Sequence, residues 1–451
     1  MTVGAEAAFS LRLRLLRGGS WVIAGKLATA GSNLVMASLA ASLLAPEPFA
    51  DYLLAYSLGQ IGWLVASLGM SSAVVRLVAE SLGRGRPDRA RGAVRAAFGW
   101  GLAGIAGVAL LLLTVGGWIL RHGFDAPLLA ASIVLATGWV VLNTLQILTS
   151  ETFRGLHDMR AASVFGGVLS GALLVVLLGT TRALVTQTSL RTVLLLVLVA
   201  SAASLLCAAP LLRRKLQALG PAARLDSREV LQVALPLWLN GLLAFGLQQC
   251  DLWILGAASE RTELAVYGAA SRLVILVSTP LVLVNMIVPP FIAELDARGE
   301  RARLERLLRA TATLAGLPAL GVLLLFVVCG GPLLRLAYHD ELYRSGALVL
   351  AILSVGKLVD VWVGPCQMAL SMTGHQLLLM RITLVTSVLT VLAGAAVAGR
   401  GGGTGLALVF CAGLIVQDVW VWLATRRATG MWTHLGLPRR ADLSFLLRRG
   451  G

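Results

Sequence analysis

Long apolar runs, each followed by a short polar and basic break, make up most of this chain. A transmembrane helix needs about 20 apolar residues, because the hydrocarbon core of a bilayer is about 30 Å thick. The pattern therefore predicts an all-α polytopic membrane protein, and runs longer than the core are expected to tilt. The twelve predicted transmembrane helices are 18–44, 49–78, 93–120, 128–153, 161–181, 190–212, 229–257, 263–293, 309–330, 344–371, 377–399 and 404–425.

Composition excludes the soluble classes of protein. Apolar residues make up 57% of the 451 positions and charged residues 13%, whereas a soluble domain carries about 25% charged residues. The five cysteines lie far apart in apolar runs, and no CxxC or His-rich cluster is present, so neither a metal site nor a disulfide framework is predicted. The predicted loops are too short to form a catalytic domain. We therefore expect a transporter without a cofactor, and not an enzyme.

The net charge of +16 indicates membrane topology better than it indicates nucleic-acid binding. Basic residues occur in short bursts between apolar runs, as in loops at an anionic membrane face, and no basic block adjoins a soluble fold. One set of loops and tails holds 25 Lys and Arg residues, and the opposite set holds seven. Because basic loops remain in the cytoplasm, both termini are predicted to be cytoplasmic.

A direct repeat divides the chain into halves. Ala50–Tyr52 matches Ala265–Tyr267 at an offset of 215, and residues 79–85 match residues 293–299 at an offset of 214. Chance matching among Ala- and Leu-rich helices is the alternative. An offset of six spans keeps the orientation through the membrane, so the repeat is parallel. The predicted organisation is two parallel six-helix lobes, at 1–212 and 229–425. A linker at 213–228 joins them, and a basic tail follows at 426–451.

Charged side chains inside the spans are candidates for function, because a charge at the bilayer centre costs about 2.5–3.5 kcal/mol. Lys26 lies about 12 Å into the first span, and Asn33 falls on nearly the same helical face. Lys357 lies about 20 Å deep, with Asp360 on the same face of its helix. The Lys357–Asp360 pair could be structural, or it could be a protonation or ion-coupling element, and the sequence favours neither interpretation.

Other polar residues within the spans have simpler explanations. Asp251 and Arg272 lie at similar depths on consecutive spans, about 9 and 14 Å from the same end, so we expect a structural ion pair. Arg76 lies near the cytoplasmic end of its span, and its side chain is expected to reach the surface. The remaining polar positions are expected to form interhelical hydrogen bonds. They are Asn143, Gln146, Asn240, Gln248, Asn285, Gln417 and Asp418.

Several short segments, spread over both halves of the chain, share the pattern of a known family. They are Leu43–Tyr52, Ser67–Arg76, Leu235–Trp238, Gln249–Asp251, Tyr267–Arg272 and Thr373–His375. In these segments the chain resembles the polysaccharide flippases of the Wzx type. It departs from them by placing alanine at positions 45, 50 and 265, where the family often has glycine.

This resemblance implies membership of the multidrug/oligosaccharidyl-lipid/polysaccharide exporter (MOP) superfamily, with a V-shaped fold around a central cavity. It implies a flippase of the bacterial inner membrane, involved in exopolysaccharide or O-antigen-type glycan export. Such a flippase moves a polyprenyl-diphosphate-linked oligosaccharide from the cytoplasmic to the outer leaflet by alternating access. Membrane lipids, a polysaccharide polymerase and a chain-length regulator are the further partners that the resemblance implies, and nucleic acid is not among them.

Intramembrane cations suit the diphosphate of such a substrate. The residues predicted to line the cavity are Lys26, Asn33, Arg76, Arg272 and Lys357. Asp360 and Asp251 are predicted to serve either in coupling to H⁺ or Na⁺ or in structural pairs. The membrane potential could also drive export, since two negative charges gain about 4.6 kcal/mol at 100 mV.

The alternative function is a cation-coupled multidrug exporter on the same fold. It would need a predominantly acidic, aromatic-lined cavity, because its substrates are cationic. Within the predicted spans, Asp251, Asp360 and Asp418 are outnumbered by four basic residues, two Lys and two Arg. The sequence therefore favours the flippase.

Overall fold

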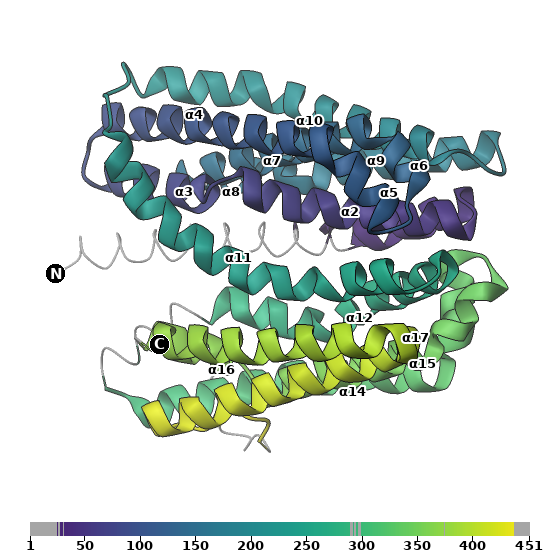
Figure 1. The fold of residues 1–451 in the computed structure, drawn as a ribbon. Helices are drawn as coiled ribbons and strands as arrows, with labels where there is room; N and C mark the ends of the chain where they lie inside the picture. The colour runs from purple at the N-terminus through teal and green to yellow at the C-terminus, as the bar shows by residue number, and fades with distance from the viewer. Residues whose placement is uncertain are drawn as a thin grey trace. The chain divides into compact units, whose positions relative to one another are not determined.

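The computed structural model describes residues 25, 28–29, 31–288, 292, 295, 299–373 and 375–436. All regular structure in these ranges is helical, which confirms the all-α fold class. The chain forms two compact units, unit 1 (residues 1–249) and unit 2 (residues 250–451). The boundary between them falls inside helix α11 (Ser227–Ala258), beyond the predicted linker 213–228 (Figure 1).

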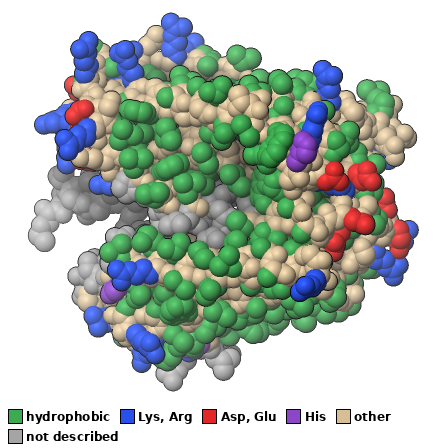
Figure 2. All heavy atoms as spheres, in the orientation of Figure 1, with side chains coloured by type: hydrophobic (Ala, Val, Ile, Leu, Met, Phe, Trp, Pro, Cys, Tyr) green, Lys and Arg blue, Asp and Glu red, His purple; other side chains and the backbone are tan. Residues whose placement is uncertain are grey.

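The described helices have the length and surface of membrane spans. Eight of them are long and apolar enough to cross a bilayer, or nine if α2 (Pro46–Ala66) and α3 (Met70–Gly83) form one span bent by 49°. Leu110, Val328 and Leu389 are 66%, 78% and 61% exposed, and apolar side chains cover much of the surface between basic groups (Figure 2). Exposed apolar surface of this extent is typical of contact with a membrane. The prediction of a multi-pass membrane protein is confirmed.

Unit 1 is organised around α7 (Ile133–Gly155). This helix packs against α2, α3, α4 (Pro87–Leu111) and α10 (Leu190–Ala218), and α9 (Leu169–Leu184) packs against α10. Prolines begin α2 and α4, where their missing N–H would have no helical acceptor in any case. The first turns of these helices therefore follow directly from the sequence.

Shorter helical segments connect the long helices of unit 1. The helices α5 (Gly117–His122), α6 (Pro127–Ala131) and α8 (Met159–Ser163) lie between them in the chain. Two π-helical segments, η1 (Leu112–Gly116) and η2 (Val164–Val168), interrupt the regular helical hydrogen bonding. Segments of this kind are rare and often occur at functional positions.

The first turns of α11 pack against the bend between α2 and α3. Gly69 has a φ of +77°, and a Cβ there would collide with the carbonyl oxygen of Ala234. The indole N–H of Trp238 donates to the carbonyl oxygen of Leu64 at 2.9 Å, close to the end of α2. Glycine is therefore required here both by the backbone conformation and by the close approach of α11. Two of the segments that carry the family resemblance meet at this point.

The connection between α10 and α11 is attached to the first turn of α4. Arg89 of α4 pairs with Glu229, and Arg91 donates to the carbonyl oxygen of Gly220. The predicted linker is thus held against α4 by charged and polar contacts at one end of the helices.

Unit 2 is organised around α15 (Ala347–Val363). This helix packs against α12 (Arg261–Ile287), α14 (Arg301–Tyr338) and α17 (Gln376–Thr429). The 3₁₀ segment η3 (Glu341–Gly346) leads from α14 into α15. Unit 2 therefore repeats the design of unit 1, with one central helix surrounded by the others.

A break at Gly364 separates α15 from α16 (Cys366–Met372). Gly364 has φ 76° and ψ −165°, and Pro365 follows it. The sequence predicts one uninterrupted span at 344–371, and this prediction is wrong at the break. The physical reason is that proline disfavours the helical conformation in the residue before it.

Helix α17 folds back on itself at Gly402, whose φ is 55° and ψ −158°. The next N–H, that of Gly403, donates to a carboxylate oxygen of Glu263 at 2.6 Å, so α12 caps the turn. The hydroxyl of Thr386 in the first half donates to Gln417 in the second half at 3.1 Å, which shows that the halves lie antiparallel. They correspond to the two spans predicted at 377–399 and 404–425.

Candidate functional site

A buried polar cluster occupies the interior of unit 2. Helix α15 contributes Lys357 and Asp360, which lie one turn apart, and the second half of α17 contributes Asp418. The break at Gly364 redirects the chain so that α16 begins beside α17, where Gln367 reaches Asp418. The cluster therefore depends on two features of the chain, the turn within α17 and the break after α15.

Asp418 is the most deeply buried carboxylate of the cluster, with no exposed surface. One oxygen, Oδ1, accepts a hydrogen bond from Nε2 of Gln367 at 3.1 Å. The other, Oδ2, has no hydrogen-bond partner among the residues that the structure describes. A buried carboxylate with an unsatisfied oxygen is costly. Neutralising this group, by a proton or by a bound cation, would relieve that cost.

Among the residues that the structure describes, Lys357 is the basic group that acts on Asp251, Asp360 and Asp418. Its ammonium attracts Asp251, Asp360 and Asp418, and the last two repel each other. Within the described part of the chain, Lys357 makes no ion pair shorter than 4.0 Å, so the direct pair with Asp360 is not formed. The cluster thus has three carboxylates and one ammonium, and it is acidic when all four groups are ionised.

Asp251 is held by contacts other than the expected one. The hydroxyl of Tyr267 donates to its Oδ2 at 3.0 Å, and the N–H of Leu252 donates to its Oδ1 at 2.9 Å. Its charge is attracted by Lys357. The ion pair with Arg272, predicted from matching depths, is not among these contacts. Depth along a helix does not fix which way the side chain points, and this accounts for the difference.

The other predicted site residues are distributed over unit 1. Asn33 is half-buried in the helix Gly31–Leu43, and Arg76 is exposed on α3. Lys26 lies outside the described residues. These residues and the cluster belong to separate units, so their assignment to one cavity stays a prediction.

Two of the predicted interhelical hydrogen bonds in unit 1 are confirmed. Asn143 of α7 donates to the carbonyl oxygen of Gly59 in α2 at 3.3 Å. Gln146, also of α7, donates to Ser170 of α9 at 2.7 Å. These bonds satisfy polar groups that lipid could not satisfy.

The described residues contain no group of three or more His, Cys, Asp or Glu side chains arranged to hold a metal ion. The three carboxylates around Lys357 do not form such a group.

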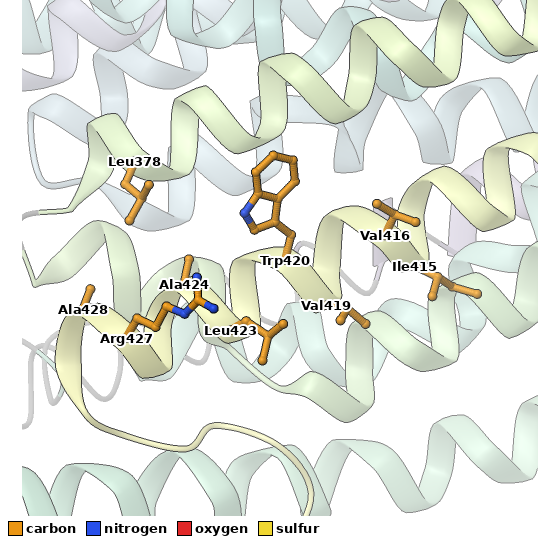
Figure 3. Close-up of a pocket in the computed structure, with 9 residues that line it drawn as sticks. All are labelled: Leu378, Ile415, Val416, Val419, Trp420, Leu423, Ala424, Arg427 and Ala428. Atoms are coloured by element: carbon orange, nitrogen blue, oxygen red, sulfur yellow. The ribbon is translucent and has the colours of Figure 1, made fainter.

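A mainly apolar cavity of about 780 Å³ lies between the two halves of α17. Leu378 comes from the first half, and Trp420, Leu423 and Arg427 come from the second (Figure 3). Arg427 is the one charged residue among its lining residues. The cavity lacks the convergent polar groups of the cluster around Lys357.

Comparison with known proteins identifies the family. The model of the family described as "Polysaccharide biosynthesis protein" matches residues 15–295, more than half of the chain. This chain belongs to that family. A second family model, MatE, matches residues 236–395. A comparison with curated proteins finds no matching sequence.

Solved structures show the same fold for members of the MOP superfamily. An inward-facing multidrug resistance MATE family transporter has a TM-score of 0.73 and 16% identity, covering 89% of this chain and 94% of that one. The lipid II flippase MurJ in an inward closed conformation has a TM-score of 0.69 and 12% identity, covering 90% and 87%. A MOP superfamily transporter from Pyrococcus furiosus has a TM-score of 0.63 and 17% identity, covering 92% and 95%.

The match to the polysaccharide biosynthesis family confirms the family resemblance seen in the sequence, and the solved structures show that the chain has the fold of MOP superfamily members. The proteins of known structure that share this fold are transporters and flippases and not enzymes.

From the sequence, Lys357, Asp360 and Asp251 are candidate site residues, whereas Asp418 is predicted only to form an interhelical hydrogen bond. The sequence predicts the same role, an interhelical hydrogen bond, for Gln417 and Asp418. Both form one, Gln417 with Thr386 in the first half of α17 and Asp418 with Gln367 in α16. Asp418 differs because its second oxygen is unsatisfied among the described residues and because Asp360 lies nearby. The signal available in the sequence was an ionisable residue in the middle of the last span.

Proposed function

We propose that this protein is a flippase that moves a polyprenyl-diphosphate-linked oligosaccharide from the cytoplasmic to the outer leaflet of the bacterial inner membrane. The observation that carries the proposal is the match to the polysaccharide biosynthesis family over residues 15–295. The fold shared with a lipid II flippase supports it, because that protein is named for a lipid-linked substrate. The glycan would be of the exopolysaccharide or O-antigen type.

Alternating access explains how such a substrate could cross. The sugars and the diphosphate cannot enter hydrocarbon, since each unsatisfied polar group there costs several kcal/mol. A polar path through the protein would shield them while the polyprenyl tail remains in lipid. The basic residues assigned to this path are Lys26, Arg76, Arg272 and Lys357, and Asn33 would add a polar contact to the sugar.

The cluster around Lys357 would couple transport to a cation. Three carboxylates share one ammonium, and Asp418 retains an unsatisfied oxygen among the described residues. Uptake of H⁺ or Na⁺ would neutralise part of this buried negative charge, and its release would restore the charge. A change of charge inside unit 2 could therefore favour one conformation over another. In this proposal Asp360, Asp251 and Asp418 bind the cation, and Lys357 sets how strongly they do so.

The test is glycan export in a strain that lacks its own flippase. We expect the wild-type chain to restore surface glycan, and Lys357→Ala and Asp418→Asn to lose export although both insert in the membrane. Arg306→Gln, at an exposed position of α14 outside the cluster, is the matched control and should retain export. Full export by both cluster variants would refute the coupling role. Failure of the wild-type chain with every glycan pathway tried would refute the flippase assignment.

Cation-coupled multidrug export is the second candidate function. Two observations favour it, namely the MatE match at residues 236–395 and the excess of carboxylates in the cluster of unit 2. Whole-cell efflux of a cationic dye separates the two candidates. Efflux that requires Asp418, together with absent glycan export, would favour the multidrug exporter.

A further inference from the structure

The cavity between the two halves of α17 is an open groove on unit 2. Val416, Trp420 and Leu423 line it and are 57%, 45% and 40% exposed. Arg427 follows at helical spacing, and Figure 3 shows it at one end of the groove with Val416 near the other. The stripe from Val416 to Arg427 is about 16 Å long. This length matches the hydrocarbon depth of one leaflet, about 15 Å.

Packing within α17 builds this groove. A Cβ at Gly413 would collide with Thr390, so the two halves touch beyond the end of the groove that is farther from Arg427. The buried side chains of Ile382 and Val421 belong to one apolar cluster, with Ala424 as a member that also lines the groove. The groove therefore has a closed end and a solid floor, and it is open on its outer side.

Arg427 presents its donors to the groove. Its side chain is exposed and belongs to the lining, and Figure 3 shows the guanidinium beside Leu423 and Ala424. Within the part of the chain that the structure describes, Arg427 makes no ion pair shorter than 4.0 Å. Arginine remains charged and has five N–H donors. An apolar groove thus ends at an accessible cation whose charge the described residues do not neutralise.

We propose that this groove binds an anionic phospholipid of the cytoplasmic leaflet. The guanidinium of Arg427 would donate to the phosphate oxygens, whose geometry arginine matches. One acyl chain would lie along Leu423, Trp420 and Val416. On the predicted topology α17 begins and ends at the cytoplasmic side, so Arg427 lies at headgroup depth and Val416 lies deeper in the hydrocarbon. The cytoplasmic leaflet is also the one that carries negative surface charge.

Charge selects this occupant over the other apolar candidates. Helix α17 contains four arginines and one carboxylate, Asp418, which is buried and bonded to Gln367. A second copy of the chain, packed about a two-fold axis at the groove, would bring its own Arg427 to the same place. The chain's own residues 437–451 contain four arginines and one aspartate. Both would set positive charge against Arg427, whereas an anionic headgroup neutralises it.

This inference does not depend on the proposed function, because lipid binding is measured on the purified protein without transport. The full-length protein is reconstituted in phosphatidylcholine vesicles that contain either phosphatidylglycerol or phosphatidylcholine brominated near the middle of the acyl chain. Bromine quenches the fluorescence of a tryptophan that it contacts. The chain has 11 tryptophans, so the quenching that disappears in Trp420→Phe is taken as the signal of the groove.

We expect phosphatidylglycerol to bind at Trp420 about fivefold more tightly than phosphatidylcholine, the factor that one arginine provides near an anionic surface. Arg427→Gln should abolish this preference, and Arg427→Lys, which keeps the charge, should retain most of it. Arg400→Gln is the matched control. It removes an equal charge from an exposed position of α17 outside the lining, and it should leave the preference unchanged. High salt should weaken the preference of the wild-type protein, which tests the charge without any substitution.

Three results would overturn the proposal. They are equal binding of the two lipids at Trp420, a preference that survives Arg427→Gln, and a loss in Arg400→Gln as large as that in Arg427→Gln. Quenching at Trp420 that appears only after residues 437–451 are removed would identify the tail as the occupant. Quenching that appears only when the protein is diluted in lipid would identify a second copy, and in either case the proposal would be wrong.

Discussion

Replacing Gly364 with alanine should destabilise unit 2 more than an ordinary glycine substitution does. Gly364 has φ 76° and ψ −165°, a region of backbone space that is almost confined to glycine. A Cβ there would also collide with the carbonyl oxygen of Thr433 and lie 2.8 Å from Cβ of Ala312. The substitution therefore forces both the backbone and two neighbouring segments to move.

The expected magnitude has two parts. Holding alanine in this conformation costs about 1–3 kcal/mol, and overpacking against the neighbours costs about 1–3 kcal/mol more. A total of about 2–6 kcal/mol corresponds to a fall in Tm of about 4 °C or more for a unit of this size. Because the break at Gly364 also places Gln367 beside Asp418, we expect transport to fall together with stability.

The assay is thermal unfolding of the detergent-solubilised protein, with Gly430→Ala as the matched control. Gly430 also has a positive φ, 78°, but a Cβ there would meet no atom within 4 Å. Its substitution should cost about 1–2 kcal/mol from backbone strain alone. If Gly364→Ala lowers Tm by no more than Gly430→Ala does, the close contact with Thr433 is not real and the reasoning fails.

Two further predictions concern unit 1. Burial raises the pKa of Asp158, but the N–H of Ala161 and the ammonium of Lys215, which lies 2.9 Å away, outweigh this effect and leave the pKa below its usual value of 3.8. The ionised Asp158 carboxylate should therefore stabilise the fold fully above about pH 4, and this stabilisation should be lost as the pH falls through the lowered pKa. Asp158→Asn should remove about 0.5–1 kcal/mol of the free energy of unfolding, and measuring Tm as a function of pH checks both expectations. Trp238→Phe should lower the free energy of unfolding by about 1 kcal/mol in chemical denaturation, because it removes the indole N–H that donates to the carbonyl oxygen of Leu64. An unchanged free energy of unfolding would contradict that hydrogen bond.

Some of the candidate site could be found from the sequence because charge in hydrocarbon is expensive. Lys357 and Asp360 stand out at mid-span for that reason, and the structure places both in one cluster. The contacts given for Asp251 are with Tyr267 and the N–H of Leu252, which its depth along the helix could not predict, because depth does not determine the direction of a side chain. The sequence does not distinguish Asp418 from the other polar residues within spans. Its burial with one unsatisfied oxygen depends on how α15 and α16 pack against it.

The sequence by itself determined that this is an all-helical membrane protein. Lipid cannot satisfy a backbone N–H or C=O group, so an apolar run of sufficient length must form a helix, and its neighbours cannot change that outcome. Only the tertiary structure decided which polar groups meet inside unit 2. The turn at Gly402 and the break at Gly364 bring α15, α16 and α17 together around Asp418. These contacts depend on how each helix is rotated about its axis, which is set by packing between helices and not by the apolar pattern of any one of them.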